Sequence, residues 1–291
     1  MQHPSRPKRK WHERNFLTRV MLPTLFAKPQ GTHRPPRFPK LKGNDLSITF
    51  IGHASFLIQT PGHNILIDPC YANWIVGQKR IRRPGLALKD LPPIDMVLIT
   101  HAHFDHLHIP TLKKVAKGQT LVLPYNVADV ISGCRFGQII EMNHWETLPV
   151  NGLKITFVPA AHWGARTLTD RHRGYGGYII EYNGRSVYHC GDSTYFKGFK
   201  EIGERCAPEI ALLPIGAYDP PSGRDHHMGP EEAVLAFEDL KAKWFIPMHY
   251  GSFRLSYEPV TEPLERLLKA SLKHAIASRV RILDEGKPER F

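Results

Sequence analysis

Residues 100–106 hold side chains of the types that bind transition metals. Their letters, Thr-His-Ala-His-Phe-Asp-His, place three imidazoles and one carboxylate within six positions, directly after an apolar, strand-like run. In an extended loop, residues two apart point the same way, so His101 and His103 can bind one cation. Asp105 and His106 lie just beyond and can bind a second. Imidazole suits zinc, and a carboxylate accepts zinc or a harder ion such as Mn²⁺.

A second set of candidates comes later in the chain. His162 and His249 each follow an apolar, strand-like run, and Asp192 comes directly after Gly191, whose backbone can turn tightly. Any one of these residues alone would more often have a structural role. As a set that follows strands, in a chain that already contains H-x-H-x-D-H, they are candidate metal ligands. The Asp192 carboxylate could bridge two ions.

Such a pair of cations would carry out hydrolysis. Two cations close together lower the pKa of a shared water from about 15.7 to roughly 7, so hydroxide is available at neutral pH. A serine or cysteine nucleophile is then not needed, and we interpret Cys190 as a small buried hydrophobic residue. The four cysteines are widely spaced and form no C-x-x-C pair, so neither a disulfide framework nor a zinc ribbon is indicated. A reducing cytoplasm is therefore expected.

The elements that must position these side chains can be predicted from the apolar pattern. The pair Asn183-Gly184 is a strong signal for a two-residue hairpin. Strands dominate the first half of the body, and strands alternate with helices in the second, which favours one layered α/β domain. Strands are expected at 46–51, 55–60, 64–67, 96–100, 120–123, 153–158, 178–182, 186–189, 210–215 and 244–248, and helices at 109–117, 230–241 and 260–278.

The positive charge of the chain is concentrated at its start. The net charge is +12, and residues 1–40 hold ten Lys or Arg against one acid, or 10 − 1 = +9. We therefore divide the chain into a basic N-terminal arm, 1–40, ending in a proline-rich extended connection, and a domain, 41–291. No run approaches the roughly 18 apolar residues of a membrane-spanning helix, and no secretory signal is expected, because Arg19 and Pro23 interrupt the apolar patch near the start.

The basic arm indicates contact with an anionic surface, either lipid or nucleic acid. A lipid surface is favoured because a purely electrostatic contact with nucleic acid does not need so many large apolar groups. The alternative is that these groups pack on the domain while the charges are merely solvated. The apolar residues of the arm are Trp11, Phe16, Leu17, Val20, Met21, Leu22, Leu25 and Phe26.

The order H-x-H-x-D-H, a lone histidine, Gly-Asp and a late histidine resembles the metallo-β-lactamase superfamily. Within this superfamily, the sequence motifs are similar to those of N-acylphosphatidylethanolamine-hydrolysing phospholipase D and its bacterial relatives, over roughly residues 46 to 265. The matching stretches are 52–55 (Gly-His-Ala-Ser), 68–69, 91–95, 101–106, 162–168 (His-Trp-Gly-Ala-Arg-Thr-Leu), 190–193 (Cys-Gly-Asp-Ser), 214–218, 227–233 and 249–253 (His-Tyr-Gly-Ser-Phe).

This resemblance implies an α/β fold, an αββα sandwich of two mixed sheets with helices on the outer faces and the metals at one edge. It also implies two divalent ions, zinc by preference, with Mn or Fe as alternatives. One ion would be held by His101, His103 and His162 and the other by Asp105, His106 and His249, with Asp192 bridging.

His227 matches a histidine close to the reacting phosphate, and we take Asp105, Asp192 and His227 as the catalytic residues. His53 could orient a metal ligand as an outer partner. Residues 193–195, Ser-Thr-Tyr, depart from the family's usual Thr-Gly-Tyr. That departure and the poorly matching N-terminus bear on the substrate, and not on the fold.

The expected function is a phosphodiesterase acting on a small-molecule or lipid phosphodiester. The alternatives are a lactonase or other ester hydrolase, a metal-dependent nuclease and a non-catalytic binding protein. The nuclease is disfavoured because the chain has no inserted second domain, so nucleic acid is not the expected partner. Retention of all seven ligand positions argues against a scaffold.

The expected location is the cytoplasm, with the arm touching an anionic inner-membrane surface, and no oligomeric state follows from the sequence. Trp74 and Trp163 could line a substrate wall or fill the core.

Overall fold

Two β-sheets form the centre of the computed structural model, which describes residues 15–33, 35–167 and 169–291. Within these ranges the first sheet has seven strands in the order β15-β1-β2-β3-β6-β7-β8. Strands β1 to β3 pair antiparallel, and β3, β6, β7 and β8 pair parallel. Their bounds are β1 Ser47–Gly52, β2 Ser55–Thr60, β3 His63–Ile67, β6 Met96–Leu98, β7 Thr120–Pro124, β8 Gln138–Met142 and β15 Pro288–Arg290.

The second sheet is also mixed. In the described part of the chain it has six strands in the order β14-β13-β12-β11-β10-β9. Strands β9 to β12 pair antiparallel and β12 to β14 parallel, so β10, β12 and β14 all run in one direction. Their carboxyl ends therefore meet at one edge of the sheet. Their bounds are β9 Thr147–Val150, β10 Leu153–Val158, β11 Gly177–Tyr182, β12 Arg185–His189, β13 Ile210–Pro214 and β14 Trp244–Met248.

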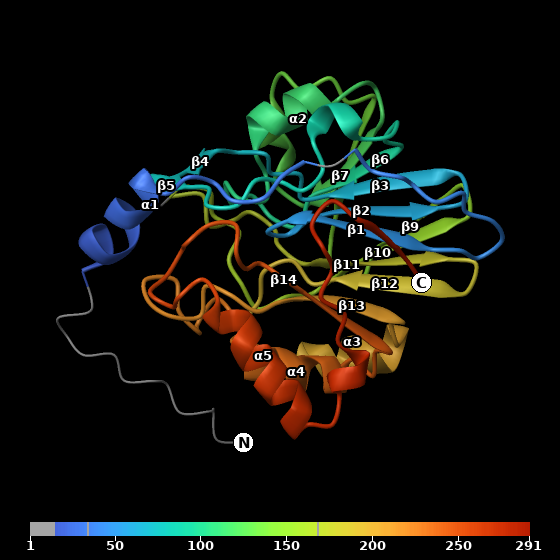
Figure 1. Ribbon diagram of the computed structural model, residues 1–291. Helices are drawn as coiled ribbons and strands as arrows, with labels where there is room; N and C mark the ends of the chain where they lie inside the picture. The colour runs from blue at the N-terminus through green and yellow to red at the C-terminus, as the bar shows by residue number, and fades with distance from the viewer. Residues whose placement is uncertain (1–14, 34, 168) are drawn as a thin grey trace.

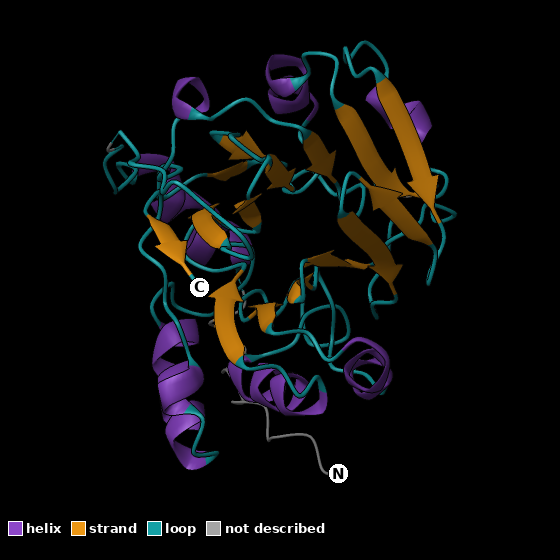
Figure 2. Ribbon diagram, turned by 90° about the vertical axis from the view of Figure 1, so that its right-hand side faces the viewer, coloured by secondary structure: helices purple, strands orange, loops and turns teal. Residues whose placement is uncertain are grey.

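Helices cover the outer faces of the two sheets (Figures 1 and 2). Helix α2 lies over the first sheet, and α3, α4 and α5 lie over the second. The expected αββα sandwich of two mixed sheets is therefore confirmed. The helix bounds are α1 Leu22–Phe26, α2 Ile109–Val115, α3 Gly198–Cys206, α4 Pro230–Asp239 and α5 Glu262–Lys273, with shorter turns η2 Leu17–Met21, η3 Leu88–Asp90, η4 Ala128–Ile131 and η5 Ala277–Arg279.

Two apolar clusters hold these layers together. The larger one includes inner-face residues of both sheets, among them Phe50 and Phe157, and continues to Phe237 of α4. The smaller one packs Leu112 of α2 on Val97 and its neighbours in the first sheet. Each cluster removes apolar side chains from water on a scale that accounts for a stable layered fold.

Most predicted strands are present within one or two residues of their expected ends. The predicted hairpin is also present, since Tyr182 pairs with Arg185 across Asn183 and Gly184, both with positive φ. The three predicted helices are present but end earlier, and the last begins at Glu262 instead of 260. The elements that the sequence pattern did not predict are α1, α3, β8, β9, β15 and the hairpin of β4 (Trp74–Ile75) and β5 (Gln78–Lys79).

Part of the predicted arm lies against the domain. Val20 is buried, and Lys79 of β5 donates hydrogen bonds to the carbonyls of Leu25 and Ala27 at the end of α1. Residues 35–40 form neither helix nor strand, as the proline-rich sequence indicates. Residues 1–14 lie outside the described chain. The division at residue 40 therefore stays a prediction.

Gly203 allows α3 to approach α4 closely. A Cβ atom at this position would lie 2.2 Å from the Asp239 carbonyl oxygen, a distance that requires the helices to separate. We expect Gly203→Ala to lower the free energy of unfolding by about 1–3 kcal/mol, the usual cost of overpacking. Urea titration followed by circular dichroism measures it. The exposed Lys200→Ala in the same helix is the control, and equal stability of the two variants would contradict this packing.

Candidate metal centre

Three histidine nitrogens converge at the first predicted metal position. His103 Nδ1 lies 3.0 Å from His101 Nε2 and 3.2 Å from His162 Nε2. Two ligand atoms each about 2.1 Å from one zinc ion, at a tetrahedral angle, lie about 3.4 Å apart. The three nitrogens are therefore close to the spacing that one cation requires.

A second cluster lies on the other side of Asp192. Asp105 Oδ2 is 3.5 Å from His249 Nε2 and 3.9 Å from His106 Nε2. The same oxygen forms a hydrogen bond of 2.9 Å with His53 Nε2. One ligand atom from each of these four residues lies within 4.8 Å of the others, which is compatible with a shared cation.

Asp192 lies between the two clusters. Its Oδ2 atom is 3.1 Å from both His106 Nε2 and His249 Nε2. The same oxygen is 3.8 Å from His101 Nε2 and 3.9 Å from His162 Nε2. Its other oxygen, Oδ1, is buried and has no hydrogen-bond partner among the described residues. A buried carboxylate in this setting requires positive charge, and these nitrogen and oxygen donors fit a divalent ion on each side.

Strand ends bring these residues together. The H-x-H-x-D-H loop follows β6, His162 follows β10, Asp192 follows β12 and His249 follows β14. Gly191 makes the turn before Asp192, since its φ is +64° and an added Cβ would lie 2.7 Å from the Gly176 carbonyl oxygen. The seven predicted ligand residues, with His227, therefore gather at one edge of the sandwich.

Burial sets the charge states of the site. It lowers the pKa of His101 and His162 well below the ordinary value, so these imidazoles are neutral at pH 7. Burial alone would raise the pKa of Asp105 and Asp192, but the surrounding histidines hold both well below the ordinary value. Neutral imidazole and ionised carboxylate are the forms that bind metal.

Asp68, at the end of β3, is a site residue to which the sequence analysis gave no role. Its Oδ2 lies 2.7 Å from His106 Nδ1 and accepts a hydrogen bond from the Thr100 hydroxyl at 2.6 Å. Its Oδ1 accepts one from the Thr100 amide. The carboxylate thus fixes the ring of His106 so that Nε2 points at Asp192, the usual function of a carboxylate behind a metal-binding histidine. The resemblance of residues 68–69 to the family is the sequence signal that points to Asp68.

His53 lies where the sequence analysis expected an outer partner. Its contact with Asp105 allows it to orient that carboxylate, and its own burial lowers its pKa to about 3. Cys190 has a core position, as interpreted, and the neighbouring His189 is buried too. His189 contacts the Ala54 carbonyl oxygen, and burial raises the pKa of the Cys190 thiol to about 12, which leaves it protonated.

A cavity of about 470 Å³ opens onto the clusters. Asp105, Asp192 and His227 line it, and Trp163 forms part of the wall, one of the two roles expected for that residue. Trp74 is instead half exposed on the β4–β5 hairpin. The full lining is Ile75, Val76, Gln78, His103, Phe104, Asp105, Trp163, Ala165, Arg166, Asp192, Pro221, Ser222, His226, His227 and Leu255.

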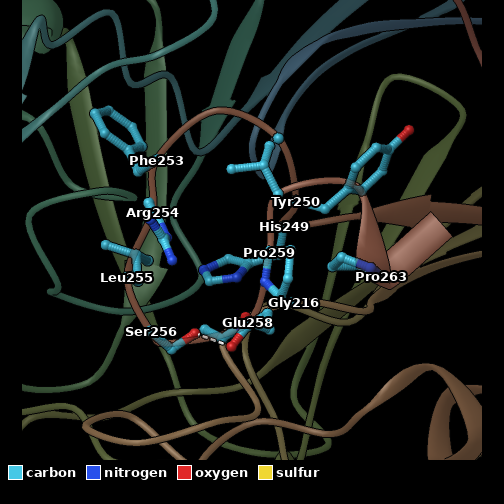
Figure 3. Close-up of a pocket in the computed structure, with 13 residues that line it drawn as sticks. Gly216, His249, Tyr250, Phe253, Arg254, Leu255, Ser256, Glu258, Pro259 and Pro263 are labelled. Carbon is cyan, nitrogen blue, oxygen red and sulfur yellow. Dashed lines mark hydrogen bonds between the residues drawn. The ribbon is translucent and has the colours of Figure 1, made fainter. Parts of the chain in front are cut away.

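A smaller cavity of about 20 Å³ lies behind His249. Figure 3 shows it, with a hydrogen bond between Ser256 and Glu258. Glu258 also accepts a hydrogen bond from the Ala217 amide at 2.6 Å. This volume has room for about one water molecule, so it is too small for a substrate.

Comparison with known proteins agrees with this geometry. The model of the β-lactamase superfamily domain matches residues 63–250. A metal-dependent hydrolase of the UPF0173 family from Methanopyrus kandleri is 35% identical over 246 residues, covering 83% of this chain and 98% of that protein. An N-acyl-phosphatidylethanolamine-hydrolyzing phospholipase D of Caenorhabditis elegans is 31% identical over 244 residues, covering 76% and 68%.

Another relative in sequence and a solved structure are also similar to this chain. An uncharacterized protein of Mycobacterium tuberculosis is 34% identical over 239 residues, and the match spans 78% of this chain but only 64% of that protein's length. The solved structure of Igni18, a metallo hydrolase from Ignicoccus hospitalis, is 27% identical with a TM-score of 0.66, covering 85% of this chain and 99% of that one.

The chain therefore belongs to the β-lactamase superfamily. Its named relatives and its cluster of candidate ligands together support an enzyme of the metal-dependent hydrolase class.

The contact between Asp68 and His106 gives a direct test of the second cluster. We expect Asp68→Asn to weaken metal binding at the second cluster by about 10- to 100-fold, because the ring of His106 loses its charged partner. Competition with a chromophoric chelator measures the affinity. The control is Asp95→Asn, an exposed carboxylate that only accepts a hydrogen bond from the Asn64 amide. Unchanged affinity in Asp68→Asn would show that this contact does not orient a ligand.

Proposed function

We propose that the chain is a dinuclear metal hydrolase, with zinc as the preferred metal and Mn or Fe as alternatives. The observation that carries this proposal is the position of Asp192 Oδ2, within 3.9 Å of histidine nitrogens from both clusters. Seven donors exceed what one tetrahedral ion uses. A shared carboxylate between two sets of donors is the arrangement expected for two ions.

We further propose that the reaction is hydrolysis of a phosphodiester. When bound, two divalent cations would supply a nucleophilic hydroxide and offset the charge that grows on the phosphoryl oxygens. Water adds to phosphorus, the bond to the leaving oxygen breaks, and the released alkoxide takes a proton to leave as an alcohol. The other product is a phosphomonoester.

The chain's own residues give this reaction its geometry. Asp105 and Asp192 fix the charge of the centre. His227 Nδ1 lies 3.9 Å from Asp192 Oδ2, on the wall of the cavity. Burial lowers the pKa of His227 to about 3, so at neutral pH the ring acts as a neutral hydrogen-bonding group. We assign it the role of positioning the phosphoryl oxygen or the leaving group.

The apolar part of the wall supports a substrate with an acyl or aryl portion. Phe104, Trp163, Val76 and Leu255 line the cavity together with the polar groups. An amphiphilic phosphodiester offers one charged group for the centre and one apolar group for this wall. The Caenorhabditis elegans relative is named for such a substrate.

A panel of three substrates tests this assignment. The metal-analysed protein would be assayed on a bis-aryl phosphate, a lactone and an N-acylated phospholipid. We expect the two phosphodiesters to be hydrolysed with a kcat/KM at least about tenfold above that for the lactone. Preference for the lactone would replace the proposal by an ester hydrolase of the same fold.

His227 should act without binding metal. We expect His227→Ala to lower kcat by about 10²- to 10⁴-fold, the usual contribution of such a group, while metal content stays at two ions per chain. Elemental analysis of the same preparation is essential, because Asp192, His227 and His249 could also hold an ion together. Loss of one ion in His227→Ala would show that the residue is a ligand.

We also propose that the protein meets its substrate at an anionic membrane surface. The outer side of η2 and α1 exposes Leu17, Leu22, Leu25 and Phe26, and Phe26 is 85% exposed. The adjoining β4–β5 hairpin exposes Trp74 and Val76. We name these six residues the apolar face. Among the described arm residues, Phe16 and Val20 pack on the body instead, in line with the alternative given for the arm.

Two observations connect this face with lipid. Val76 belongs both to the apolar face and to the wall of the cavity, so the face borders the entrance to the metal centre. The sequence of residues 1–40 adds nine net positive charges, each worth about 1 kcal/mol near an anionic bilayer. Among the described residues, no helix is long and apolar enough to span a membrane.

Vesicle co-sedimentation tests the apolar face in the full chain. We expect binding to vesicles containing anionic lipid to exceed binding to neutral vesicles. Phe26→Glu should weaken it by at least about tenfold, because one large inserted side chain contributes about 1.5–3 kcal/mol. Leu272→Glu on α5 is the matched control, because Leu272 is also a large apolar side chain and is 72% exposed. An equal loss of vesicle binding in both variants, or no vesicle binding by the parent protein, would contradict the proposed membrane contact.

A further inference from the structure

Arg166 is the only Lys or Arg among the residues described as lining the cavity. It follows His162 by four positions, in a segment to which the sequence analysis assigned no chemistry beyond a resemblance. A permanent cation in this position requires an explanation, because a half-buried guanidinium loses part of its hydration.

The guanidinium is held rigidly by the metal-binding loop. Its Nη1 donates hydrogen bonds to the carbonyls of Ala102, at 2.7 Å, and Leu107, at 2.9 Å. These two residues stand at either end of the stretch that contains Phe104 and Asp105. The guanidinium carbon also lies 4.0 Å from the centroid of the Phe104 ring. Three contacts therefore fix both the position and the plane of the group.

Only one of its three nitrogens is used in these contacts. A guanidinium carries five N–H donors in a planar fork. Within the described part of the chain, Nε and Nη2 of Arg166 have no hydrogen-bond partner. By contrast, the guanidinium of Arg173, in the same segment, is fully engaged with Asp129, Asp170 and the Asn126 carbonyl. Arg166 thus combines a fixed position with unused donors.

We propose that Arg166 is the anion-binding residue of the cavity, which recognises a negatively charged oxygen of the substrate through Nε and Nη2. The chemical class that fits is a phosphodiester or phosphonate monoanion attached to an apolar group, since Phe104 and Trp163 lie on the same wall. A fork of donors matches two oxygens on one phosphorus better than a single ammonium group does.

This inference rests on the proposed function for its choice of anion, but binding can be measured without turnover. A phosphinate carries two P–C bonds and no ester bond, so a hydrolase cannot turn it over. The probes are methyl(phenyl)phosphinate, which carries one negative charge over two oxygens, and dimethyl(phenyl)phosphine oxide, which is neutral and has nearly the same shape. Titration calorimetry on the zinc-loaded protein gives both dissociation constants.

We expect Arg166→Met to weaken binding of the charged probe by about 10- to 100-fold, the range of a charge-assisted hydrogen bond. Binding of the neutral probe should change by less than about twofold. Arg166→Lys should recover only part of the affinity, because an ammonium lacks the planar fork. Arg171→Met, which removes an exposed cation from the same segment, is the control for net charge and should bind both probes as the parent does.

A second measurement separates anion binding from mere support of the loop. Addition of guanidinium chloride at non-denaturing, millimolar concentrations to Arg166→Ala should restore affinity for the charged probe and leave that for the neutral probe unchanged. Metal content is measured alongside. Equal weakening for the two probes, or loss of metal in both Arg166→Met and Arg166→Lys, would overturn the proposal and leave Arg166 as a clamp on the loop. Hydrolysis of lactones alone, with selective binding of the charged probe intact, would refute the phosphodiesterase and not this inference.

Discussion

The buried carboxylate of Asp192 governs the arrangement of the site, because its negative charge must be compensated inside the protein. An ionised carboxylate removed from water is costly unless positive charge and hydrogen-bond donors surround it. Here nitrogens of four histidines from three separate segments lie within 3.9 Å of one oxygen atom. Burial keeps the imidazoles of His101 and His162 neutral. Burial alone would also lower the pKa of His106 and His249, but the nearby carboxylates, above all Asp192, raise it. Cations held by these donors would balance the negative charge of Asp192. The need to balance this charge therefore connects the arrangement of the donors with the proposed metal chemistry.

The two sheets meet this requirement because their strands end at one edge. Strands β10, β12 and β14 run in one direction and deliver His162, Asp192 and His249, while β6 of the facing sheet delivers the H-x-H-x-D-H loop. An outer layer then holds the donors in orientation: Asp68 behind His106, and the His226 carbonyl against His162 Nδ1. Loops alone could not hold so many converging groups to the precision that metal binding needs.

The sequence predicted the parts of this centre that are local. A run of six residues contains four donors, and short apolar strands precede the other three, so type and spacing were enough to select these seven residues as candidate ligands. Their division between two ions was implied by the family resemblance. Asp68 and Arg166 escaped because their roles depend on contacts with residues 38 and 59 to 64 positions away. Helix α3 was missed because Gly198 and Gly203 weaken its helical signal, although Gly203 is required where α3 meets α4. Strand β15 pairs with β1 from the far end of the chain, and no local pattern predicts such a pairing.

The central claim is that one carboxylate is shared by two ions. Crystals of the zinc-reconstituted protein, measured with X-rays on both sides of the zinc absorption edge, test it directly. We expect two anomalous peaks per chain, one among His101, His103 and His162 and the other among Asp105, His106 and His249, each within coordinating distance of an oxygen of Asp192. A single peak in the presence of excess zinc, or two peaks of which one lies away from Asp192, would contradict it.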